Sequence, residues 1–235
     1  MIIFRVDIAL AAFCLVVLGI EAQAQTSPNQ SAIASWRAST GDAMEVGKLT
    51  PSVEEGRELY EVCSECHRSN GGGIPDGTMP QVAGQHSSVL IKQLMDIRSG
   101  LRRNPSMYPY VARLDDPQDL ADLAAYIETL PIPEDNGEGS GRDLERGKRL
   151  YGENCLRCHG ARGEGSALSF YPKLAGQHYR YLVRQIIDIA GGRRGNAHPE
   201  MVDAVVDFSA RDVANVADYV SRIEKTVSVP VPVSE

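Results

Sequence analysis

The sequence predicts an all-α protein that contains two copies of one small helical unit. Apolar residues recur at helical spacing in several segments, and no convincing run of alternating apolar and polar residues predicts a β-strand. In addition, residues 56–130 and 147–223 match each other at an offset close to 92. We therefore expect two similar helical domains rather than one large domain within the 235 residues.

The composition is that of a folded protein whose core is short of large side chains. Apolar residues make up 43% of the chain and charged residues 23%, which excludes a wholly disordered or fibrous protein. The net charge of −7, without a block of like charge, argues against nucleic acid as a partner, because phosphate binding needs a basic face. Only 6% of residues are aromatic, so a domain of this size needs another apolar group at its centre.

The N-terminus has the pattern of a secretory signal. An apolar run over residues 8–20 follows Arg5, and the small-residue pattern Ala-Gln-Ala stands at 22–24. The run is shorter than the roughly 20 residues that span a bilayer, so we expect residues 1–24 to be a cleaved signal peptide and the protein to be periplasmic. An uncleaved anchor, lengthened by residues 2–4, is the alternative.

Residues 25–50 form an N-terminal extension with no counterpart in the second repeat, and they contain Trp36, the only tryptophan. We expect an extended or partly helical segment packed on the first domain.

The first domain, residues 51–130, is expected to contain three helices. Ser52 and Glu55 form a capping box for the first helix. Apolar residues on one face predict a second helix over residues 87–99. The pair Asp116-Pro117 supplies a cap and a first-turn proline for the third helix.

The second domain, residues 143–225, repeats this scheme, and Ser209 and Asp212 start its last helix. Residues 131–142 are rich in proline, glycine and acidic side chains and are expected to form a linker. Residues 226–235 are expected to form a C-terminal tail.

Each repeat contains one Cys-x-x-Cys-His motif. The two sets are Cys63, Cys66 and His67, and Cys155, Cys158 and His159. This pattern is the attachment signature of haem c, in which two thiols bond to the porphyrin and the imidazole binds the iron. A zinc site would need four nearby ligands, but the two cysteine pairs are 89 residues apart, and a thioredoxin-like dithiol would need a βαβ setting. Two haem c groups are therefore predicted.

A methionine is the leading candidate for the sixth iron ligand in each repeat, because a thioether opposite imidazole closes the coordination and suits electron transfer. Met107 and Met201 are matched between the repeats and follow the motif histidines by 40 and 42 residues. The rival ligands are unmatched methionines and nearby histidines: Met79, Met95, His86, His178 and His198.

With these motifs the chain resembles the dihaem class I cytochrome c family, and within it cytochrome c4. The shared marks are Gly-x-x-Leu-Tyr before each haem motif, Pro-x-x-Ala-Gly-Gln after it, and Gly-x-Arg before each matched methionine. The resemblance implies two class I cytochrome c folds about a pseudo-twofold axis, with haem propionates near each other. It also implies axial ligation by His67 with Met107 and by His159 with Met201.

Four arginines near these motifs have two interpretations. They could lie beside the propionates or on the solvated surface: Arg102, Arg103, Arg193 and Arg194. The repeats also differ, since Tyr60 precedes Cys63 by three residues but Tyr151 precedes Cys155 by four. The first helix is therefore expected to enter its haem site in a shifted phase.

Three functions compete. The resemblance implies a periplasmic electron carrier, not an enzyme, that works between redox partner proteins such as a terminal oxidase, a reductase or a dehydrogenase. The second is a haem subunit of a dehydrogenase or of a sulfide-oxidising flavoprotein, associated with the membrane only through its partners. The third is a dihaem enzyme such as a peroxidase; it would need an open sixth position, and the matched methionines count against it.

Overall fold

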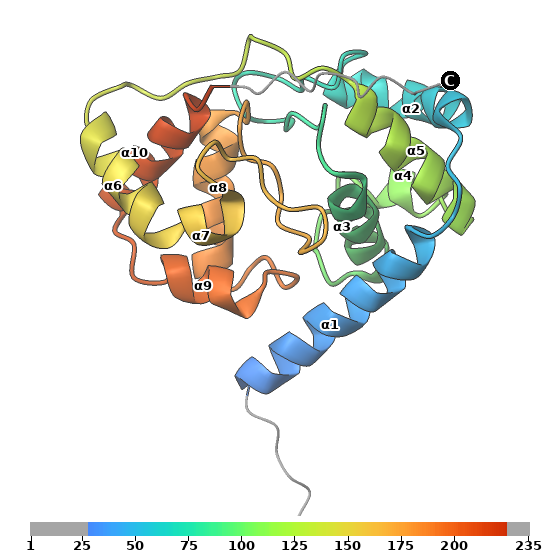
Figure 1. Cartoon of the computed structure of the whole chain (residues 1–235), viewed down its shortest axis with the longest axis horizontal. Helices are drawn as coiled ribbons and strands as arrows, with labels where there is room; N and C mark the ends of the chain where they lie inside the picture. Colours follow the sequence, from blue (N-terminus) through green and yellow to red (C-terminus); the bar gives the residue numbers. More distant parts are fainter. Residues whose placement is uncertain (1–27, 225–235) are drawn as a thin grey trace, which may run out of the picture.

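The structure, a computed structural model, describes residues 28–224, and over this range the all-α prediction is confirmed. This part of the chain forms ten helices and no β-strand, apart from an isolated bridge between Ser166 and Tyr171. The predicted signal peptide, residues 1–24, and the predicted tail, residues 226–235, lie outside the described residues. Figure 1 shows the two repeats side by side, with α1 running below the first repeat and toward α9 of the second.

The helices follow the order of the two repeats. The first repeat contains α2 (Val53–His67), α3 (Ser87–Ser99), α4 (Tyr108–Val111) and α5 (Pro117–Thr129), and the second contains α6 (Leu144–Asn154), α7 (Leu156–His159), α8 (Tyr179–Ala190), α9 (Pro199–Val205) and α10 (Ala210–Ser221). Helix α1 (Pro28–Val46) precedes both. Among these described helices, none is long and apolar enough to cross a bilayer.

The helix starts agree with the predicted caps, with one difference. Ser209 and Asp212 form the complete capping box of α10. The Ser52 side chain caps α2 by accepting from the Glu55 amide at 3.2 Å, but the Ser52 amide donates to Asp122 of α5 at 2.8 Å. The carboxylate of another helix thus takes the place of the Glu55 side chain, and this bond ties the start of α2 to α5.

In each repeat the first helix crosses the last at a glycine. A Cβ atom on Gly56 would lie 2.0 Å from the Asp122 carbonyl oxygen, and one on Gly147 would lie 2.2 Å from the Asn215 carbonyl oxygen. Only glycine permits this approach of two backbones. The crossing therefore fixes the position of the haem motifs, which lie at the C-terminal end of α2 and just after α6.

The one-residue difference between the repeats is absorbed by a break in the second. Helix α2 continues without interruption to His67, whereas α6 ends at Asn154 and a new turn, α7, begins after Cys155. The tyrosines therefore keep the same role: Tyr60 donates to the Arg68 carbonyl at 2.8 Å, and Tyr151 donates to the Gly160 carbonyl at 2.6 Å. Each bond fixes the backbone just after a motif histidine.

The described part of the N-terminal extension is helical and reaches further than expected. Helix α1 packs against α3 and α5 of the first repeat, as the sequence suggested, and it also contacts α9 of the second repeat. Its contact with α9 was not expected.

Replacing Arg68 by glycine is expected to stabilise the first domain. Arg68 has a φ of 63° and a ψ of 160°, whereas Gly160 takes the equivalent place in the second repeat with a φ of 77°. This backbone conformation costs a residue with a Cβ atom of order 1–3 kcal/mol. The Arg68–Asp135 ion pair that would be lost is exposed and contributes little.

We therefore expect Arg68→Gly to raise the free energy of unfolding by about 1 kcal/mol, measured by chemical denaturation of the holoprotein. Arg68→Ala is the control, because it removes the ion pair and keeps the strain, and it should give no gain. A less stable Arg68→Gly protein would contradict the assignment of strain.

Candidate haem sites at the domain junction

A cavity of about 700 Å³ takes its walls from both repeats. The chemistry-bearing residues predicted from the sequence all line it: Cys63, Cys66, His67, Met107, Cys155, Cys158, His159 and Met201. The fold therefore brings the two motifs and the two matched methionines to one space. The start of α2 and of α6 packs against the last helix of its repeat. The motifs lie at the other end, in α2 and around α7, where they line the cavity.

The two motif histidines are held in the same tautomer. Nδ1 of His67 lies 2.9 Å from the Pro80 carbonyl oxygen, and Nδ1 of His159 lies 3.0 Å from the Pro172 carbonyl oxygen. Because a carbonyl oxygen can only accept, Nδ1 carries the proton in each ring, and Nε2 keeps its lone pair. Burial lowers the pKa of both imidazoles, which favours the neutral form that ligates iron.

The four motif cysteines are half-buried free thiols, and the first of each pair is the more withdrawn from solvent. Burial raises the pKa of Cys63 to about 11 and that of Cys155 to about 12. A redox dithiol needs an accessible thiolate of lowered pKa, so these thiols have the opposite character. In the described part of the chain, no group of three or more His, Cys, Asp or Glu side chains could hold a metal ion.

The matched methionines both lie in the segment that follows the middle helix of their repeat. Met107 caps α4, and Met201 lies in the first turn of α9; both are half-buried. Among the rivals, Met95 packs against the hydrophobic core of the first repeat, but Met79 also lines the cavity.

The matched histidines join the two domains. Nε2 of His86 lies 2.8 Å from the Glu164 carbonyl oxygen, and Nε2 of His178 lies 2.8 Å from the Gly72 carbonyl oxygen. Glu164 and Gly72 are themselves equivalent positions of the two repeats. His86 and His178 are the N-cap residues of α3 and α8, but neither side chain caps its helix and neither lines the cavity. Both rings bond to a carbonyl of the other repeat instead.

The glutamine before each histidine also makes hydrogen bonds to the backbone of the other repeat. The Gln85 side chain accepts from the Lys173 amide at 2.8 Å and donates to the Lys173 carbonyl at 2.9 Å. The Gln177 side chain makes the same pair of bonds with the backbone of Gln81, at 3.1 and 2.9 Å. The repeated Gln-His dipeptide is therefore one part of the interface of the two domains. Its presence in both repeats was the signal in the sequence, but nothing there indicated a partner.

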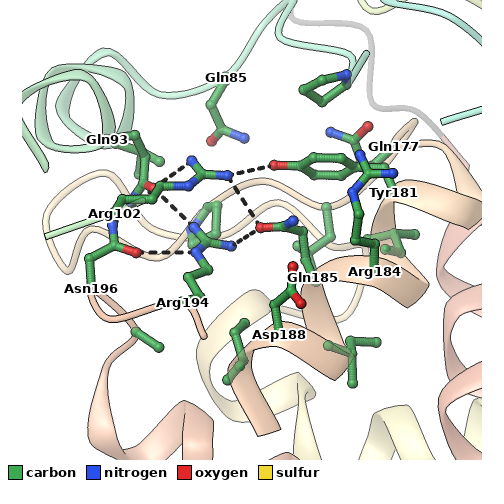
Figure 2. A pocket seen from close by; sticks show the side chains of 18 of the residues that line it. Gln85, Gln93, Arg102, Gln177, Tyr181, Arg184, Gln185, Asp188, Arg194 and Asn196 are labelled. Atoms are coloured by element: carbon green, nitrogen blue, oxygen red, sulfur yellow. Dashed lines mark hydrogen bonds between the residues drawn. The ribbon is translucent and has the colours of Figure 1, made fainter. Parts of the chain in front are cut away.

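Two guanidinium groups meet in the wall of the cavity (Figure 2). Gln93 accepts from Arg102 at 2.8 Å and from Arg194 at 3.0 Å, and Gln185 accepts from Arg194 at 2.9 Å and from Arg102 at 3.2 Å. Each glutamine oxygen thus bridges both cations. Arg102 also donates to the Tyr181 hydroxyl at 2.9 Å.

These two cations fit an anionic occupant of the cavity. Their hydrogen bonds within the described residues go to neutral groups, and burial together with the nearby Arg102 lowers the pKa of Arg194 to about 10, which leaves it charged at neutral pH. Both side chains are half-buried, and two neighbouring cations that are partly withdrawn from water and bonded to neutral groups are stabilised by a counter-charge. The two carboxylates of a haem supply one, so the residues present fit two haems with their propionates at the junction. The other two arginines are exposed, and Arg193 pairs with Asp188 at 2.8 Å.

A fold of two helical repeats, each with a Cys-x-x-Cys-His motif at a shared cavity, defines a c-type cytochrome with two haem-binding domains. The cytochrome c family model matches residues 53–131 and 144–224, and the chain belongs to this family. It carries two haem c groups and is an electron-transfer protein, not an enzyme.

Relatives that match most of the chain support this assignment. The chain is 32% identical to cytochrome c4 of Pseudomonas aeruginosa over 176 residues, which cover 72% of this chain and 87% of the relative. It is 34% identical to the thiosulfate dehydrogenase electron acceptor of Stutzerimonas stutzeri over 172 residues, which cover 68% and 78%. Among solved structures, reduced cytochrome c4 from Pseudomonas stutzeri matches with a TM-score of 0.67 and 28% identity, over 74% of this chain and all of that one (100%).

Removing the glutamine exchange is expected to uncouple the two domains. Gln85→Ala or Gln177→Ala deletes the two hydrogen bonds that cross the junction and leaves a backbone N–H and C=O of the other repeat without these partners, at a cost of about 1–3 kcal/mol. The double variant should unfold in two separate thermal transitions where the parent unfolds in one, measured by calorimetry of the holoprotein.

Gln118→Ala is the matched control, because Gln118 also makes two side-chain bonds but only within the N-terminal half, to Thr50 and Asp122. It should lower stability without splitting the transition. A single transition in the double variant would refute the role given to the glutamines.

Proposed function

We propose that each domain holds one haem through its own residues and that the protein passes single electrons between redox partner proteins. The haem of the first domain would be bonded to Cys63 and Cys66 with His67 and Met107 as axial ligands, and that of the second to Cys155 and Cys158 with His159 and Met201. The observation that carries this proposal is that all eight side chains line one cavity, with both imidazoles neutral and Nε2 free of the proton.

The chain's own groups would have distinct tasks in electron transfer. When bound, the two haems would supply reversible one-electron chemistry. The prolyl carbonyls fix the imidazole rings, and a methionine thioether in each domain would occupy the remaining position and exclude water or substrate from the iron. Arg102 and Arg194 would bind propionates from both haems, because each already bridges the two repeats through Gln93 and Gln185.

The domain limits and the compartment are part of the proposal. Domains over residues 51–130 and 143–225, joined by a linker at 131–142, agree with the matched ranges and with the helix bounds. Residues 1–24 would direct the protein to the periplasm and be cleaved, and a carrier would meet its partners there.

A second candidate function is electron acceptor of a thiosulfate dehydrogenase. Two comparisons favour it: the relative from Stutzerimonas stutzeri described above, and a thiosulfate dehydrogenase (TsdBA) structure from Marichromatium purpuratum, which matches with a TM-score of 0.65 and 31% identity over 73% of this chain and 40% of that one. In this role the protein would receive electrons from a catalytic partner and carry no substrate site of its own.

Replacing either matched methionine is expected to remove one iron–sulfur bond. The ferric protein should show the methionine-to-iron charge-transfer band at the red edge of the visible spectrum, and Met107→Ala and Met201→Ala should each lower its intensity by about half. Each variant should also gain a site for an added ligand such as imidazole, measured by optical titration.

Met79→Ala is the control, because Met79 lines the cavity but has no counterpart in the second repeat. It should leave the band intact. A full band in Met107→Ala or in Met201→Ala would show that another residue is the ligand in that domain.

A further inference from the structure

Helix α1 is a feature that distinguishes the two repeats. It lies outside both stretches that match the cytochrome c family, and no equivalent helix precedes α6 in the described part of the chain. It nevertheless contacts both repeats, since it packs on α3 and α5 and reaches α9. Two of its residues, Trp36 and Ser39, are three apart and therefore face the same side of the helix.

A buried carboxylate joins α1 to both repeats. Asp96 of α3 accepts from the Ser39 hydroxyl, from Lys92 Nζ at 2.7 Å and from Asn196 Nδ2 at 2.6 Å. All four residues are buried, so the carboxylate depends on these partners for its stability. One side chain therefore links α1, the first repeat and the loop that precedes α9.

This arrangement is not a property of the repeat. Asp188, the counterpart of Asp96, is half-buried and pairs with Arg193 on its own repeat at 2.8 Å. The difference between the two aspartates coincides with the presence of α1 on one side only.

Trp36 makes a second contact across the domain boundary. Its ring stands edge-on to that of His198, with 4.5 Å between centroids and an interplanar angle of 90°, and Lys92 Nζ lies 5.5 Å from its centroid. Trp36 and His198 both line the haem cavity. The tryptophan thus forms part of the wall of the cavity and touches the second repeat there.

The residues that α1 touches lead directly to Met201. His198 is the N-cap of α9: its Nδ1 accepts from the Glu200 amide at 3.2 Å, and its carbonyl accepts from the Met201 amide at 2.9 Å. Asn196, bonded to Asp96, lies two residues before this cap. A movement of His198 or Asn196 would therefore be transmitted through the first turn of α9 to the methionine.

We propose that α1 is a positioning element for Met201, acting across the domain boundary through Trp36 on His198 and through Ser39 and Asp96 on Asn196. This inference rests on the proposed role of Met201 as sixth ligand of the second haem. The ring contact of Trp36 is made to His198 in the second repeat and not to the segment that contains Met107. The two iron–sulfur bonds consequently differ in strength by a contribution that α1 makes to the second alone.

The test is made on the full-length holoprotein with Trp36→Ala, Ser39→Ala and the conservative Trp36→Phe, which keeps a ring for the contact with His198. In the reduced protein, the ε-methyl resonances of the two ligand methionines are followed by NMR and assigned with Met107→Ala and Met201→Ala. Imidazole affinity of the ferric protein is measured by optical titration, and amide exchange of residues 199–205 by mass spectrometry.

We expect Trp36→Ala to shift or broaden the Met201 methyl resonance and leave that of Met107 in place. One haem should bind imidazole about tenfold more tightly, as is typical when a residue that supports a ligand is removed. Exchange of α9 amides should become faster. Ser39→Ala should change the same quantities less, and Trp36→Phe should restore them. Met44→Ala, an exposed change on the same helix, should alter none of them.

The outcomes separate the inference from the proposed function. If Met201→Ala keeps both methyl resonances, Met201 is not a ligand and the proposed function of this residue fails. If Met201→Ala loses one resonance but Trp36→Ala and Ser39→Ala leave spectra, imidazole affinity and α9 exchange unchanged, the ligand assignment holds and the positioning role of α1 is refuted. Equal changes at both methionines would also refute it, because they would indicate general loosening.

Discussion

Two like charges at the junction of two domains are the constraint on which the rest of the structure depends. Arg102 and Arg194 are half-buried and share the oxygens of Gln93 and Gln185, and neutral dipoles alone do not offset the repulsion between two neighbouring guanidinium groups. Anions at this place would stabilise the arrangement, and haem propionates would supply them. In the proposed function, the haems would therefore provide both the counter-charge and the apolar centre, and each domain would provide half of the site.

The repeat explains how such a site is built, and its departures explain how the two haems can differ. Equivalent residues make the same hydrogen bonds in both directions across the junction: Gln85 bonds to Lys173, and Gln177 bonds to Gln81. The same repeated sequence therefore forms both sides of the contact. The close helix crossings at Gly56 and Gly147 then fix the position of each motif at the cavity. Helix α1 breaks this symmetry, because it packs on the first repeat and also reaches the second at α9, the helix that contains Met201.

The local patterns were predictable and the contacts between domains were not. Haem attachment, helix starts at Ser52, Asp116 and Ser209, and the two repeats follow from spacing along the chain, because caps and the Cys-x-x-Cys-His motif depend on near neighbours. The roles of His86 and His178 depend on carbonyls 78 and 106 residues away, and polar residues at a helix start have several local uses that look alike in sequence. For the same reason Arg102 could be assigned to the surface or to a propionate, and α1 could be placed only on the first domain.

The central claim is that the two domains depend on haem for a stable fold, and the most direct measurement is the unfolding of the chain without attached haem. The protein with all four motif cysteines replaced by alanine would be compared with the holoprotein by far-UV circular dichroism and thermal denaturation. The account predicts low helicity and no cooperative transition, because the cavity walls and the paired guanidiniums lose their partners. Native-like helicity with a sharp transition in the haem-free chain would contradict it.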